Sequence, residues 1–327
     1  MIIARSPLRI SLGGGGTDLA SYYRENGGFL LAAAIDKYVY VTVTKPFTSG
    51  IFLKYSEIET TNDINDVKHN IIREALRIYH NKSNPQIEIT TLSDIPTGTG
   101  LGSSGSFTSA LVKALNAFNR LHISQEEIAQ VACDIEINKL GEPIGKQDQY
   151  IASYGGISSF AFHQDDSVVT SSLVLDQTII SKLEDNLLLF FTGFSRDASS
   201  ILKDQNDKSK TKDLDMIKNL HYVKEIGYKS KIAIENGSLD DFGDLMHEHW
   251  QNKKNRSKGM SNSEIDLWYE DGIKAGAIGG KVVGAGGGGF LMFYTNDPEK
   301  LRAAMSGHKL EEVRFKFDFE GTKLLYS

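Results

Sequence analysis

The chain has 327 residues, of which 40% are hydrophobic, 24% charged and 9% aromatic, as in ordinary globular proteins. Its 42 acidic and 36 basic residues give a net charge of -6, so no overall positive field favours nucleic acid as a partner. The single cysteine, Cys133, cannot form an internal disulfide, and no apolar run approaches the roughly 20 residues of a membrane span. We therefore expect a reduced, cytoplasmic protein without nucleic-acid or membrane partners; its oligomeric state is left open.

In the first half of the chain, residues 2–12 alternate as in a strand, and Thr17 is expected to cap a short helix that begins at Asp18. Residues 38–44 and 51–55 are rich in β-branched and aromatic residues and are predicted to pair as a hairpin. Further elements follow in order: a helix over 66–80, a strand over 86–92, helices over 107–121 and 124–140, and strands over 155–162 and 167–174.

The second half begins with a strand over 187–192. Helices are predicted near 196–205, 213–235, 239–251 and 263–275, then two strands around a glycine-rich segment, then strands over 313–319 and 322–326. Because helices and strands do not alternate strictly, the pattern favours two α+β domains over one doubly wound sheet. The length also predicts two domains, which we assign to residues 1–170 and 171–327.

Almost half of the 31 glycines gather in three segments, 13–16, 98–105 and 279–289. The middle segment lies between a predicted strand and a predicted helix and contains a Gly-x-Gly-x-x-Gly pattern. A second helix, opened by a capping box at Ser124, follows in place of the parallel strand of a dinucleotide-binding unit, which argues against that fold. Backbone N–H groups at a helix start favour phosphate, whereas the alternative is a plain tight turn.

The glycine segments also carry a resemblance. Residues 96–105 resemble the central motif of the GHMP kinases, which include galactokinase, homoserine kinase, mevalonate kinase and phosphomevalonate kinase. Residues 6–18 and 284–290 resemble the first and third motifs of that superfamily, so the likeness spans nearly the whole chain. It implies an N-terminal domain like ribosomal S5 domain 2, a C-terminal ferredoxin-like domain, and the use of ATP and Mg²⁺.

Within the superfamily, the heptose 7-phosphate kinases are the most similar. The segments that carry this likeness are 13–18, 35–41, 144–150 and 279–281, and fucose kinase domains share much of the pattern. The resemblance implies a kinase that phosphorylates the anomeric C1 hydroxyl of a sugar phosphate, most closely D-glycero-D-manno-heptose 7-phosphate. The alternatives are L-fucose kinase or another sugar-1-kinase, and a catalytically silent nucleotide- or metabolite-binding protein.

By the same resemblance, Asp148 is the catalytic base and Arg9 assists it, while Ser104 and Glu136 hold magnesium. Without the motif, Asp148 would be an ordinary acid in the first turn of a helix, Arg9 an exposed strand residue and Glu136 part of a solvated helix face. The residues expected to bind ATP are Gly98, Gly100, Leu101, Gly102, Ser103, Ser104 and Gly105. Those expected to bind the sugar substrate are Gly14, Gly15, Thr17, Asp18, Lys281 and Gly287.

A substrate that already carries a phosphate needs a cationic anchor. Candidates outside the central loop are Lys37, Lys253, Lys254 and Lys281. Two of these open a short basic run over 253–258, of a kind that is usually solvated. The sequence does not say which cation serves.

Overall fold

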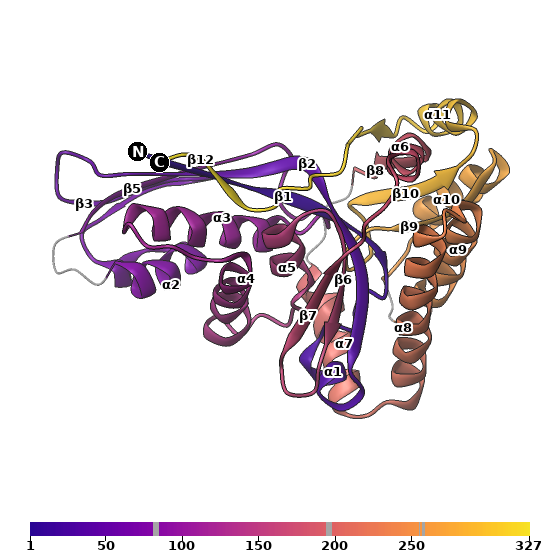
Figure 1. Cartoon of the computed structure of the whole chain (residues 1–327), viewed down its shortest axis with the longest axis horizontal. Helices are drawn as coiled ribbons and strands as arrows, with labels where there is room; N and C mark the ends of the chain where they lie inside the picture. Colours follow the sequence, from indigo (N-terminus) through magenta and orange to yellow (C-terminus); the bar gives the residue numbers. More distant parts are fainter. Residues whose placement is uncertain (81–84, 194–197, 255, 257–258) are drawn as a thin grey trace.

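The computed structural model describes residues 1–80, 85–193, 198–254, 256 and 259–327, and their strands form one sheet of eight strands and one of four (Figure 1). The strands of the larger sheet are β1 (Ile2–Gly13), β2 (Gly28–Thr44), β3 (Gly50–Lys54), β4 (Ile58–Thr61), β5 (Gln86–Ser93), β6 (Ile157–Phe162), β7 (Val168–Ser172) and β12 (Lys323–Tyr326). Those of the smaller sheet are β8 (Leu187–Phe191), β9 (Ala277–Val282), β10 (Phe290–Thr295) and β11 (Glu311–Glu312).

Helices pack against both sheets (Figure 1). In the first half of the chain they are α1 (Ala20–Asn26), α2 (Asn70–Tyr79), α3 (Ser103–Phe118), α4 (Gln125–Cys133) and α5 (Gln147–Tyr154). In the second half they are α6 (Gln177–Asn186), α7 (Ala198–Lys210), α8 (Leu214–Glu235), α9 (Leu239–Lys254), α10 (Ser263–Lys274) and α11 (Pro298–Gly307). No helix in the described part of the chain is both long and apolar enough to span a bilayer.

The long strand β2 organises the larger sheet. Its first part, residues 28–33, pairs with β6, and its last part, residues 39–44, pairs with β5, while β1 runs antiparallel along its other edge. The last strand, β12, returns to pair with β1, so the two ends of the chain lie side by side (Figure 1). The split near residue 170 stays a prediction, and β12 contributes to the first sheet from the far end of the sequence.

Strand β1 positions the site because its two faces have different surroundings. Leu8, Ile10 and Leu12 are fully buried in a core that also holds residues of β8 and β10, so both sheets share this core. The residues between them, Arg9 and Ser11, point to the opposite face, as the period of two requires, and line a pocket. Packing on one face of β1 therefore fixes polar groups on the other.

The structure confirms the α+β class and the capping box at Ser124, where the Ser124 hydroxyl and the Glu127 carboxylate bond reciprocally to backbone N–H groups. It corrects the predicted hairpin of 38–44 with 51–55, because β5 lies between β2 and β3 and pairs parallel with β3. It also corrects the cap at Thr17: α1 begins later, and the Thr17 hydroxyl donates to backbone carbonyls instead.

Other differences concern where elements begin and end. Residues 313–319 form no continuous strand; the strand is confined to β11, with one isolated bridge from Phe317 to Ile35. Helices α6 and α11 were not predicted. Helix α3 begins at Ser103, earlier than predicted and within the central glycine segment, and α4 continues as a π-helical turn over Asp134–Lys139.

Candidate active site

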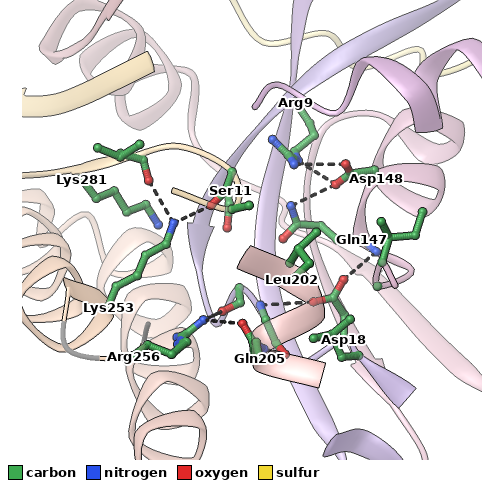
Figure 2. Close-up of a pocket in the computed structure, with 18 of the residues that line it drawn as sticks. Arg9, Ser11, Asp18, Gln147, Asp148, Leu202, Gln205, Lys253, Arg256 and Lys281 are labelled. Carbon is green, nitrogen blue, oxygen red and sulfur yellow. Dashed lines mark hydrogen bonds and ion pairs between the residues drawn. The ribbon is translucent and has the colours of Figure 1, made fainter. Parts of the chain in front are cut away.

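A pocket lies where the first glycine segment, the start of α5, the end of α9 and β9 meet (Figure 2). It contains about 710 Å³ of empty space, part of it open to solvent. Four of the described side chains that line it are cationic (Arg9, Lys253, Arg256 and Lys281), and two are carboxylates (Asp18 and Asp148). The pocket is therefore cationic in a chain whose net charge is negative.

Arg9 and Asp148 form a two-pronged ion pair at one side of this pocket (Figure 2). The Nε of Arg9 donates to Oδ1 of Asp148 at 2.9 Å and Nη2 donates to Oδ2 at 3.1 Å, while Nη1 donates to the Gly100 carbonyl. Arg9 is only 5% exposed, so it is not an exposed strand residue. Asp148 stays partly exposed in the first turn of α5, where its carboxylate can meet a ligand.

The central glycine segment ends directly beside Asp148. Gly102 is the N-terminal cap of α3 in the left-handed conformation, at φ 78°, and no side chain caps this helix start. A Cβ at Gly102 would lie 3.2 Å from the Asp148 carboxylate, and one at Gly105 would lie 2.7 Å from the Asp148 Cβ. The start of α3, which favours anions, is thus in contact with the acidic side chain of Asp148. Phosphoryl transfer requires this juxtaposition.

Other residues of this segment hold its shape. The buried Leu101 accepts a hydrogen bond from the Arg9 backbone N–H at 2.9 Å, and Gly98 has a positive φ. The buried Ser103 hydroxyl has no partner among the described residues, whereas the Ser104 side chain is exposed.

The third glycine segment packs against the central one. A Cβ at Gly284 would lie 2.6 Å from the Gly100 carbonyl oxygen, and a Cβ at Gly289 would lie 2.0 Å from that of Thr99. The segment also connects the antiparallel strands β9 and β10, so it is a hairpin turn and a packing surface at once. Gly287 donates its N–H to the Met260 carbonyl at 2.8 Å and does not line the pocket.

Ser104 and Glu136 meet as the sequence predicts. The Ser104 hydroxyl donates to one oxygen of Glu136 at 2.6 Å, and the Gln149 amide donates to the other at 2.9 Å. Glu136 is 2% exposed, and burial raises the pKa of its carboxyl. No cluster of three metal-binding side chains exists among the described residues. One buried carboxylate and one hydroxyl fit Mg²⁺ that takes its other ligands from nucleotide phosphates and water.

Some residues in and next to the first glycine segment hold the loop in shape, whereas others line the pocket. Gly14 lies against the Phe29 backbone and Thr17 bonds within the segment, so both build the loop rather than line the pocket. Gly15 and Asp18 do line it. Asp18 accepts from the backbone N–H groups of Gln147, at 3.0 Å, and Gly16, at 3.2 Å. Burial outweighs these bonds and raises the pKa of Asp18.

Opposite Asp148, the pocket wall carries Lys253, Arg256 and Lys281 (Figure 2). They are 7%, 6% and 2% exposed, so the expectation of a solvated basic run is wrong for Lys253 and Arg256; residues 255, 257 and 258 lie outside the described part. Burial, then the charges of Arg9 and Arg256, lowers the pKa of Lys281 to about 7.

The other two candidate anchors lie elsewhere. Lys37 pairs with Asp36 at 3.1 Å, and the Lys254 ammonium lies 3.6 Å from Asp266. Neither lines the pocket.

Sequence reasoning missed several pocket residues. Arg256 and Gln205 bond to each other at 3.2 Å beside the first glycine segment, and His249 lies 3.4 Å from the Lys281 ammonium. The only available signal was the basic run itself, whose spacing does not reveal which members turn inward.

Comparison with known proteins agrees with this geometry. Residues 70–156 match the GHMP kinases N terminal domain and residues 230–309 match the GHMP kinases C terminal domain. The chain is 32% identical to a D-glycero-alpha-D-manno-heptose 7-phosphate kinase of Campylobacter jejuni, over 98% of each chain. The chain belongs to the GHMP kinase family.

Other GHMP kinase relatives are similar over most of the chain. A bifunctional fucokinase/GDP-fucose pyrophosphorylase of Arabidopsis thaliana is 28% identical over 94% of this chain and 31% of its own length. The crystal structure of a D-glycero-D-manno-heptose 1-phosphate kinase from Bacteroides thetaiotaomicron matches all of both chains with a TM-score of 0.82 and 27% identity. As a GHMP kinase, this protein is an ATP-dependent phosphotransferase.

Proposed function

We propose that this kinase transfers the γ-phosphoryl group of ATP to the anomeric C1 hydroxyl of a sugar phosphate, D-glycero-D-manno-heptose 7-phosphate. The observation that carries the proposal is the position of Asp148, between the uncapped start of α3 and the cationic pocket. The names of two similar proteins, both heptose phosphate kinases, support the choice of sugar.

In this mechanism the central segment binds the nucleotide phosphates through its backbone N–H groups and its hydroxyls. The sugar hydroxyl lies against Asp148, which accepts its proton as the oxygen attacks in line with the leaving group. Arg9 holds the Asp148 carboxylate in one orientation through two hydrogen bonds and adds positive charge where negative charge develops. Asp18, which lines the same pocket, accepts hydrogen bonds from sugar hydroxyls.

Ser104 and Glu136 would hold magnesium beside the nucleotide. Bound there, the ion would neutralise phosphate charge during the transfer. Glu136 suits this role because its carboxylate is buried and hydrogen-bonded to neutral groups, so a cation relieves the cost of that burial.

The test is ADP release over a panel of sugars and sugar phosphates, with phosphorus NMR of the product. Asp148→Asn keeps the shape of the side chain and is expected to lower kcat by about 10²- to 10⁴-fold. A matched control is Asp165→Asn, in a surface turn where the carboxylate bonds only locally to Ser167. Normal turnover by Asp148→Asn would remove the base from the mechanism. If none of the sugars on the panel causes ADP release, the result would favour the silent binding protein.

L-fucose kinase is the second candidate, because fucokinases are also similar over most of this chain. Comparing kcat/KM for heptose 7-phosphate, free heptose, mannose and L-fucose separates the two. Equal or better use of L-fucose would replace the proposed substrate and leave the roles of Arg9 and Asp148 unchanged.

A further inference from the structure

The pocket contains three cations that the phosphoryl-transfer step does not use. Lys253 comes from the last turn of α9, Arg256 lies just beyond that helix, and Lys281 belongs to β9. All three are more than nine-tenths buried and line the same pocket. Different elements therefore converge to place three basic side chains together inside the protein.

Their partners in the described structure are neutral. The Lys253 ammonium donates to the Val282 carbonyl at 3.2 Å and to the Gly284 carbonyl, and the Lys281 ammonium lies 3.4 Å from the His249 ring nitrogen Nδ1. None of the three cations forms an ion pair with a described carboxylate, although cations elsewhere on the chain do.

Arg256 is held in place and still has donors to spare. Its Nε donates to Asn219 at 3.0 Å, and its Nη1 donates to the Gly15 carbonyl at 3.3 Å and to Gln205 at 3.2 Å. Its second terminal nitrogen, Nη2, is buried without a partner among the described residues. A guanidinium fixed by neutral oxygens with one nitrogen free is prepared to receive an oxyanion.

The two pocket carboxylates form no ion pair with these cations, although the charge of Asp18 acts on Arg256 from a distance. Asp148 is bound to Arg9, and Asp18 accepts from two backbone N–H groups. Buried charges that lack a counterion are costly, and a bound anion would relieve that cost. The low pKa of the Lys253 and Lys281 ammonium groups, which results from burial and from mutual repulsion with neighbouring cations, reflects this cost.

We propose that Lys253, Arg256 and Lys281 form the receptor for a phosphate that the substrate already carries, at the end remote from the hydroxyl that reacts. Figure 2 shows the three cations on one side of the pocket and Asp148 on the other, so a sugar chain between them presents one end to each. The inference rests on the proposed function and selects a phosphorylated sugar over a neutral one. A neutral sugar would leave the buried donors unpaired.

The decisive measurement is the ratio of kcat/KM for heptose 7-phosphate to that for free heptose. Arg256→Met is expected to lower kcat/KM for the sugar phosphate by about 10- to 100-fold, the contribution of charged hydrogen bonds, and to change that for free heptose by less than about 3-fold. The control is Lys254→Met, from the same basic run but beside Asp266. An equal loss with both sugars would overturn the receptor and assign Arg256 to the nucleotide or to the fold.

A binding measurement keeps the test independent of catalysis. With MgADP saturating the nucleotide site, inorganic phosphate is expected to raise the melting temperature of the wild type and of Lys254→Met, and to have little effect on Arg256→Met. Equal stabilisation of all three proteins, or of none, would overturn the inference. If phosphate protects only the proteins with Arg256, but no sugar is phosphorylated, then the proposed function fails and the anion receptor stands.

Discussion

Replacing Lys281 with methionine is expected to make the empty protein more stable. Lys281 is 2% exposed, and its pKa is lowered from 10.5 to about 7. Each pKa unit corresponds to about 1.4 kcal/mol, so holding this group in the fold at pH 7 costs about 4 kcal/mol. Methionine fills much of the same volume without the charge and loses only the contact with His249. Because substituting a buried charge in this way is often stabilising, we expect a gain of about 1–4 kcal/mol.

The assay is thermal unfolding of the ligand-free protein across a pH series. Between pH 7 and 10.5 the unfolded chain keeps the Lys281 proton while the folded protein has released it, so the cost is complete below pH 7 and vanishes above 10.5. The advantage of Lys281→Met over the wild type should therefore shrink as pH rises through this window.

The control is Lys254→Met, a half-buried lysine with a nearby carboxylate, which should change stability by less than about 0.5 kcal/mol. A Lys281→Met protein that is less stable than the wild type at pH 7, or whose advantage does not change with pH, would refute the reasoning.

Three further predictions concern Glu136 and the start of α3. Glu136→Gln, assayed over a magnesium titration, should need more Mg²⁺ for half-maximal rate; an unchanged requirement would remove Glu136 from the ion, and Ser104→Ala tests the other proposed ligand. When the wild type is acidified, its activity should begin to fall at a higher pH than it would if Glu136 were exposed, because burial raises the pKa of Glu136. Gly105→Ala should lower kcat strongly because its Cβ would lie 2.7 Å from that of Asp148, whereas Gly307→Ala, with no atom within 4 Å, should retain normal kinetics.

The sequence predicted which side chains meet around Asp148 and Glu136 better than it predicted the cations of the opposite pocket wall. Arg9, Asp148 and Ser104 belong to segments that carry the family resemblance, and the structure pairs Arg9 with Asp148 and Ser104 with Glu136. Arg256 belongs to no such motif. A run of basic residues looks the same whether the chain continues into solvent or folds back, and only tertiary structure turns Arg256 toward Gly15.

The same limit explains the errors in the fold. The segments 38–44 and 51–55 both form strands, as predicted, but their pairing depends on β5, which lies later in the sequence and inserts between them. Local patterns identify a strand from its own residues, whereas the choice of neighbour is a non-local competition.

The contact between the central and third glycine segments restricts how this protein can evolve. An overpacked pair of side chains can usually be repaired by a second mutation that shortens the opposing residue. Here a Cβ at Gly284 or Gly289 would meet the carbonyl oxygens of Gly100 and Thr99, which are main-chain atoms that no substitution can make smaller. No second substitution can therefore make room for a side chain at either glycine. The contact between the two halves of the chain depends on positions where only glycine fits.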